Sequence, residues 1–210
     1  MNRFPPGYLV LVSLCCVILI DVGISSLTGI SPAFRLGLIR LLQAGCMAGL
    51  LLLSPRGPAC LGLTGQPLYQ GIRTGLIWSA FMGAGTLLFA CLILLAGENP
   101  FFLLGPVSFS WHPAVFFAIA CVLSPIAEEF FFRGFLYTYM RRFMPVVAAA
   151  LVSSVLFAAC HPSMSSLHLI PFLGGLVFAA AFEYSKSLAA PLIIHILGNT
   201  ALMLVQYGAN

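Results

Sequence analysis

The residues best suited to chemistry stand in the segment SPIAEEFFFRGFL (124–136), where Glu128 and Glu129 are followed by Arg133. The whole chain has only five acidic residues, so two neighbouring glutamates in an apolar segment are an uneven use of a scarce residue type. On an α-helix, residues four apart meet, whereas adjacent residues point about 100° apart. We therefore expect Glu129 to pair with Arg133, and Glu128 to face another direction, where it could act as a general base or acid.

Two further polar groups follow in otherwise apolar stretches. His161 ends the stretch FAACH (157–161), and HILGN (195–199) places His195 and Asn199 four residues apart. That spacing puts His195 and Asn199 on one helix face. A lone histidine in an apolar helix is usually a satisfied core residue, but these residues occur together with an unpaired glutamate. The combination indicates a polar site inside a bundle of helices.

Other catalytic classes fit the same residues less well. Two histidines and a carboxylate form a catalytic zinc set, but the sequence lacks H-E-x-x-H and Asn199 is a poor zinc ligand, so we expect no metal. Cys160 directly precedes His161, and adjacent helical residues diverge, which disfavours a cysteine nucleophile. The hydroxyl groups near His168 are explained better as polar loop residues; they are Ser163, Ser165 and Ser166.

A non-catalytic role stays open from the residues alone, because intramembrane Glu and His side chains also build proton relays in carriers. His195 and Asn199 help to distinguish a catalytic site from a proton relay. A relay does not need a fixed pair of neutral donors, whereas a site that stabilises an oxyanion does. Asp21, late in the first apolar run, is interpreted as a structural partner of Arg35 or Arg40.

The composition places the chain in a lipid bilayer. Hydrophobic residues make up 61% of it and charged residues 7%, whereas a soluble domain carries about 25% charged residues. The net charge of +4 is spread out without a basic patch, so we expect no nucleic-acid partner. The seven cysteines form no C-x-x-C pair and sit mostly in apolar runs, where cysteine behaves as a small hydrophobic residue.

The apolar residues predict an all-α, polytopic membrane bundle. A helix that crosses the hydrocarbon core needs about 20 apolar residues. Loops rich in Gly and Pro, such as 54–67 and 97–113, separate the apolar runs. No internal repeat is visible, so we expect a single membrane domain over 1–210, with the motifs within 124–200. Seven runs qualify as spans: 8–29, 34–53, 73–96, 113–140, 144–160, 167–183 and 187–206.

The basic residues predict the orientation of these spans. Positive residues accumulate in cytoplasmic loops. Here they fall at the N-terminus and in every second loop, which predicts a cytoplasmic N-terminus; they are Arg3, Arg56, Arg73, Arg141, Arg142 and Lys186.

The three motifs resemble those of the CaaX protease and bacteriocin-processing enzymes, the CPBP or Abi family. EEFFFRG (128–134) is similar to E-E-x-x-x-R, FAACH (157–161) to F-x-x-x-H, and HILGN (195–199) to H-x-x-x-N. They occur in the order of the family, and none departs from its motif. The first hundred residues resemble the family only as generic spans.

The resemblance implies a glutamic-type intramembrane protease that needs no cofactor. Glu128 and His161 would activate a water molecule, and His195 and Asn199 would donate to the oxyanion of the tetrahedral intermediate. The remaining motif positions, Glu129 and Arg133, would support Glu128.

The expected partner is a membrane-associated protein or peptide, lipidated or with a C-terminal anchor segment. The expected location is a bacterial cytoplasmic membrane. The alternatives are a membrane carrier or scaffold with a buried Glu/His relay, and a zinc-dependent intramembrane protease.

Overall fold

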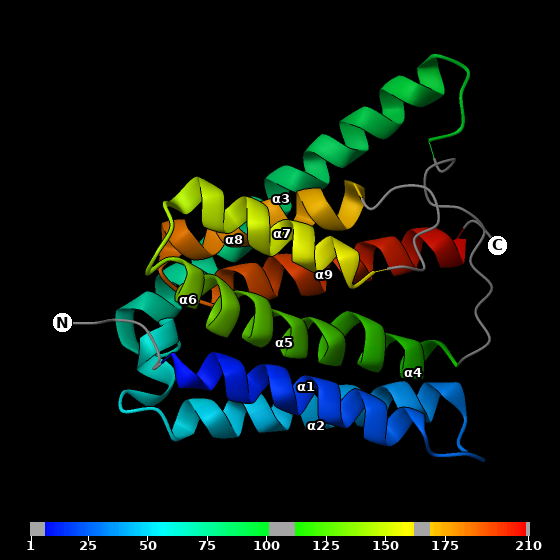
Figure 1. Cartoon of the computed structure of the whole chain (residues 1–210). Helices are drawn as coiled ribbons and strands as arrows, with labels where there is room; N and C mark the ends of the chain where they lie inside the picture. Colours follow the sequence, from blue (N-terminus) through cyan, green and yellow to red (C-terminus); the bar gives the residue numbers. More distant parts are fainter. Residues whose placement is uncertain (1–6, 101–111, 162–168, 209–210) are drawn as a thin grey trace.

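The computed structural model describes residues 7–100, 112–161 and 169–208, and these form a bundle of helices with no strand among them (Figure 1). The Gly- and Pro-rich segment 54–67 turns sharply at Gly62, whose φ of 65° lies in the left-handed region that glycine adopts without strain. The helices, in chain order, are α1 (Tyr8–Ser25), α2 (Pro32–Leu52), η1 (Gly57–Leu61), α3 (Gly65–Leu95), α4 (Pro113–Phe116), η3 (Phe117–Leu123), α5 (Ser124–Glu129), η4 (Phe130–Tyr137), α6 (Thr138–Met140), α7 (Val146–Ala159), α8 (Leu169–Ser185) and α9 (Ala189–Gly208).

Each predicted apolar run corresponds to a helix or to one continuous row of helices, so the prediction of a polytopic all-α bundle is confirmed. Within the described residues, five helices are long and apolar enough to cross a membrane, namely α1, α2, α3, the row 113–140 and α9. The apolar helices α7 and α8 are shorter. The third helix starts earlier than expected, at Gly65 instead of residue 73.

The row Pro113–Met140 carries the two glutamates between two wider helical segments. η3 and η4 are π-helices, and α5, which bears Glu128 and Glu129, lies between them. π-helical turns are rare and frequently occur at functional sites. The local winding therefore marks the same segment that the charge pattern of the sequence singled out.

This row runs between two groups of helices (Figure 1). The pair α1 and α2 packs on one side, with α2 against α5 and α1 against η4. The group α7, α8 and α9 packs on the other side. The first half of α3 lies against α9, and its second half extends away from the bundle (Figure 1). The glutamates of α5 are therefore enclosed from both sides.

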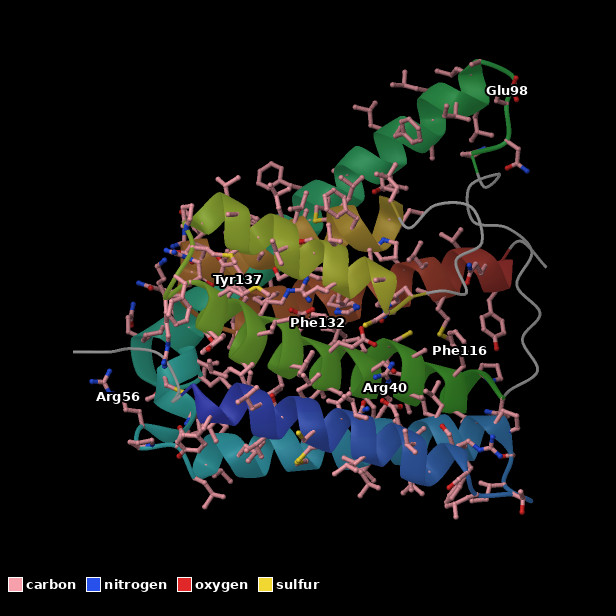
Figure 2. All side chains as sticks on the ribbon, viewed as in Figure 1. Arg40, Arg56, Glu98, Phe116, Phe132 and Tyr137 are labelled. Atoms are coloured by element: carbon pink, nitrogen blue, oxygen red, sulfur yellow. The ribbon has the colours of Figure 1, made fainter. Side chains whose placement is uncertain are left out.

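Basic residues gather at the end of the bundle where the described chain begins. Gly7 lies against Arg142 there, and the backbone of Gly62 lies against that of Lys186. Arg56 lies at this end and Glu98 at the opposite tip of α3 (Figure 2). This clustering is the pattern on which the predicted cytoplasmic N-terminus rests, and the orientation stays a prediction.

Gly175 lets α7 and α8 approach closely, and we expect Gly175→Ala to destabilise the bundle. An alanine Cβ there would lie 2.9 Å from the side chain of Ser154. Such overpacking typically costs about 1–3 kcal/mol. Gly174→Ala is the matched control, because its Cβ would lie 3.6 Å from the ring of Phe178, an ordinary contact. Thermal unfolding in detergent should show a lower Tm for Gly175→Ala only; equal Tm values would contradict the close contact.

Candidate active site

A buried ion pair joins Glu129 and Arg133 at the candidate site. Both side chains are fully buried, and Arg133 Nη1 donates to Glu129 Oε1 at 2.9 Å. Arg133 Nη2 also donates to the Gly175 carbonyl at 3.1 Å. The guanidinium carbon lies 4.6 Å and 5.0 Å from the ring centroids of Phe157 and Phe178, within the range of a cation–π contact. The pairing expected from the four-residue spacing is therefore present, and it ties η4 to α7 and α8.

His195 lies between the two glutamates. Its Nδ1 is 3.0 Å from Glu129 Oε1, and its Nε2 is 3.8 Å from Glu128 Oε2. The ring stacks on Phe178, with centroids 4.5 Å apart and an angle of 22° between the planes. A carboxylate can only accept, so Nδ1 carries the proton of this bond. In the neutral ring, Nε2 then keeps its lone pair and faces Glu128.

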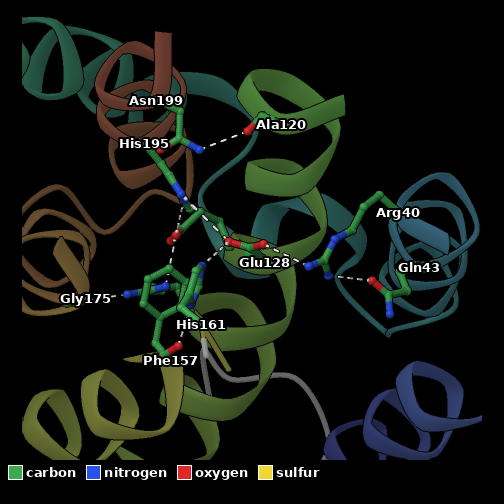
Figure 3. A network of polar contacts seen from close by, with 11 residues as sticks. Arg40, Gln43, Ala120, Glu128, Phe157, His161, Gly175, His195 and Asn199 are labelled. Carbon is green, nitrogen blue, oxygen red and sulfur yellow. Dashed lines mark hydrogen bonds and ion pairs between the residues drawn. The ribbon is translucent and has the colours of Figure 1, made fainter. Parts of the chain in front are cut away.

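Glu128 meets three side chains from other parts of the chain, namely Arg40, His161 and His195 (Figure 3). Its Oε2 lies 3.7 Å from His161 Nε2 and 3.8 Å from His195 Nε2. Its Oε1 lies 3.3 Å from Nη2 of Arg40, on α2. The distances to the two histidines exceed those of direct hydrogen bonds, and one water can bridge polar groups at such separations.

His161 has its tautomer set by the backbone of α7. Its Nδ1 is 2.8 Å from the carbonyl of Phe157, one turn earlier. A carbonyl only accepts, so Nδ1 donates and Nε2 carries the lone pair of the neutral ring. That nitrogen faces Glu128, so both histidines present a proton-accepting nitrogen to the same carboxylate oxygen.

Asn199 lies one turn beyond His195 on α9, and its amide has a different partner. Asn199 Nδ2 donates to the carbonyl of Ala120, in η3, at 2.9 Å (Figure 3). The structure thus brings Glu128, His161 and His195 together, and places Asn199 beside this group with its donor engaged by the backbone. The serines at 163, 165 and 166 lie outside the described residues.

Sequence reasoning missed a chain of polar contacts that reaches Glu128 from the first two helices. Arg40 Nη1 donates to Gln43 Oε1 at 3.0 Å, and Gln43 Nε2 donates to Asp21 Oδ2 at 2.9 Å. Asp21 is therefore joined to Arg40 through Gln43, whereas Arg35 donates to the carbonyl of Leu27. The signal in the sequence was the presence of these three polar residues in apolar runs.

A cavity of about 230 Å³ opens where these groups meet. Glu128 and His161 reach it from one side and Arg40 from the other, whereas His195 and Asn199 are not among the described residues that line it. Cys160 is also a lining residue, directly beside His161. The described residues that line it are Val17, Asp21, Arg40, Gln43, Ala127, Glu128, Phe131, Phe132, Cys160 and His161.

Comparison with known proteins finds a family to which the C-terminal half of the chain is similar. Residues 110–201 match the family described as type II CAAX prenyl endopeptidase, Rce1-like. This match confirms the resemblance expected from the three motifs, which all lie within those residues.

Two curated bacterial proteins are similar to part of the chain. The membrane-embedded CAAX protease MroQ of Staphylococcus aureus is 31% identical over 98 residues, which cover 44% of this chain and 39% of MroQ. The protein named "Putative membrane peptidase YdiL" of Bacillus subtilis is 27% identical over 88 residues, covering 42% of this chain and 36% of YdiL. The matched stretches thus span less than half of either relative. No solved structure matches the chain.

Proposed function

We propose that this chain is an intramembrane endopeptidase of the glutamic type, which cleaves a peptide bond of a membrane-associated protein or peptide. The observation that carries the proposal is the Glu128 carboxylate, enclosed in the bundle and approached on one oxygen by Nε2 of both His161 and His195. Ion pairs account for Glu129 with Arg133 and for one oxygen of Glu128 with Arg40, but they do not explain why Nε2 of two histidines faces the other oxygen of Glu128. The family match supports the same class of chemistry.

In the proposed reaction, a water molecule lies between Glu128 Oε2 and His161 Nε2. Glu128 accepts a proton from the water while the water oxygen forms a bond to the carbonyl carbon. The π electrons of the carbonyl move to its oxygen, which gives a tetrahedral intermediate. Glu128 then returns the proton to the amide nitrogen, the C–N bond breaks, and the products are a carboxylic acid and an amine.

His195 and Asn199 are the oxyanion donors that the family resemblance implies. His195 Nε2 faces the Glu128 side of the site and would donate there in its protonated form. Asn199 would have to release the carbonyl of Ala120 to donate to a substrate. Glu129 orients His195 through Nδ1, a contact that fixes the direction of the ring.

The proposed substrate is a protein or peptide held at the membrane, lipidated or with a C-terminal anchor segment. Both relatives come from bacteria, which supports a location in a bacterial cytoplasmic membrane. A zinc-dependent mechanism is disfavoured because the Arg40 cation lies 3.3 Å from Glu128, where it would repel a metal ion. Among the described residues, no group of three or more His, Cys, Asp or Glu side chains is arranged to hold a metal.

The test is cleavage of a quenched fluorescent peptide by the purified full chain in liposomes. One version ends in a farnesylated cysteine and three further residues; the other carries the same sequence without the lipid. We expect the lipidated version to be cleaved at a rate that a zinc chelator leaves unchanged. Loss of activity to the chelator and recovery with zinc would favour the metalloprotease alternative. A chain that cleaves neither peptide, nor an otherwise identical peptide with a C-terminal anchor segment, would favour the carrier or scaffold alternative.

A further inference from the structure

We propose that Arg40 is a further catalytic residue, which stabilises the oxyanion that forms when the substrate carbonyl is attacked. The inference rests on the proposed peptidase function. Arg40 lies on α2, outside residues 110–201 that match the family. The part of the chain that resembles known enzymes only as generic spans would thus supply a component of the active site.

Arg40 lines the same cavity as Glu128 and His161. It lies at mid-length of the bundle, between α2 and the glutamate-bearing row (Figure 2). Its side chain is 27% exposed, whereas those of Glu129 and Arg133 are fully buried. A substrate carbonyl that enters this cavity toward Glu128 and His161 therefore meets the guanidinium of Arg40 as well.

Arg40 has donors to spare, whereas the side-chain donor of Asn199 is engaged by the backbone. A guanidinium has five N–H donors. Among the described residues, Nη1 of Arg40 contacts Gln43 and Nη2 contacts Glu128, and each of these nitrogens carries a second N–H; the Nε atom is itself buried and has no hydrogen-bond partner there. By contrast, Asn199 Nδ2 is engaged by Ala120, and neither Asn199 nor His195 is among the described residues that line the cavity.

Arg40 is held in place by a chain of hydrogen bonds from α1 and α2. Gln43 accepts from Nη1 and is itself bonded to Asp21, so the guanidinium is fixed from two helices before a substrate arrives. Fixed donors stabilise a transition state without reorganising during the reaction, and the effect is large where water is excluded. Asp21, which sequence analysis assigned to a merely structural pair, then supports a catalytic cation.

Negative charge moves from Glu128 to the substrate during the proposed reaction. Before attack, the negative charge is on Glu128, 3.3 Å from Arg40. When Glu128 takes the proton from water, this carboxylate becomes neutral and the carbonyl oxygen becomes negative. In this proposal the guanidinium lies beside both the Glu128 carboxylate and the substrate carbonyl oxygen, so the negative charge moves from one partner of Arg40 to the other. The cation is released from Glu128 at the step in which the oxyanion appears.

The experiment compares kcat and KM of the parent with those of Arg40→Gln, Arg40→Lys and Arg35→Gln, on the farnesylated fluorescent peptide in liposomes. Loss of one oxyanion donor typically lowers kcat about 100- to 1000-fold, so we expect that fall for Arg40→Gln, with KM nearly unchanged. Arg40→Lys keeps the positive charge but loses the planar guanidinium with its several N–H donors, and we expect kcat to fall on the order of tenfold. Arg35→Gln is the matched control on the same helix, and it should behave like the parent.

The possible outcomes distinguish a failure of the role proposed for Arg40 from a failure of the proposed peptidase function. Cleavage by the parent that is lost in Glu128→Gln, together with an unchanged kcat in Arg40→Gln, would overturn the role of Arg40 alone. A rise in KM with kcat unchanged would also overturn it, because Arg40 would then only bind substrate. If Arg40→Gln does not accumulate, Arg40→Lys decides, and parental kcat in that variant would contradict the proposal. A parent without any peptidase activity would overturn both the function and the catalytic role of Arg40.

Discussion

Glu128→Gln is expected to abolish peptide cleavage while the protein still inserts and accumulates at the level of the parent. Glutamine keeps the size of the side chain and one acceptor oxygen, but it cannot take up the proton of the attacking water. Loss of general-base catalysis lowers turnover by about two to four orders of magnitude. The measurement is kcat on the fluorescent peptide in liposomes, with the enzyme concentration determined on the same samples.

Glu98→Gln is the control for this prediction. It removes the same charge from an exposed position at the far tip of α3, and it should leave kcat unchanged. Cleavage by Glu128→Gln at the parental rate would show that the carboxylate is not the base. The cluster around Glu128 would then be explained most simply as a site of structural ion pairs.

Glu129→Gln should lower the stability of the protein as well as its activity. The side chain and its partner Arg133 are fully buried, so the substitution leaves a guanidinium without its countercharge inside the bundle. Breaking a buried ion pair by removing one partner costs about 3–5 kcal/mol. His195 also loses the carboxylate that holds its Nδ1, so activity falls for a second reason. Thermal unfolding in detergent and the amount of protein in membranes measure the effect on stability.

Arg133→Ala should resemble Glu129→Gln more than Glu128→Gln. It removes the ion pair, the hydrogen bond to the Gly175 carbonyl and the contacts with the Phe157 and Phe178 rings. If Glu129→Gln and Arg133→Ala both unfold at the temperature of the parent, a structural role for the Glu129–Arg133 ion pair is contradicted. We thus expect Glu128→Gln to lower turnover alone, and Glu129→Gln to lower both turnover and stability.

Local spacing was enough to predict one half of this site. The Glu129–Arg133 contact follows from two residues one turn apart on the same helix, and α5 and η4 keep them within 2.9 Å in spite of the π-helical turn. The seven apolar runs likewise follow from composition, because only helices of this kind satisfy their backbone groups in lipid. Such features need no knowledge of how the helices are arranged.

The other half depends on packing between distant segments. Arg40 reaches Glu128 only because α2 lies against α5, and nothing in the spacing of the first hundred residues indicates that contact. The partner of Asn199 was missed for a similar reason, since the carbonyl of Ala120 belongs to a π-helical segment on another part of the chain. Residue types identified the candidates, and the arrangement of the helices decided which of them meet.

The shortness of α7 has a consequence for the bilayer around the site. Its 14 residues extend about 21 Å at about 1.5 Å per residue, whereas the hydrocarbon core is about 30 Å thick. A long helix such as α3 can relieve hydrophobic mismatch by tilting, and its outer half does lean away from the bundle (Figure 1). A short helix instead requires the lipid beside it to thin. His161 lies two residues beyond the end of α7, so local thinning would bring headgroups and water down to the level of this histidine while the rest of the bundle remains in a bilayer of ordinary thickness.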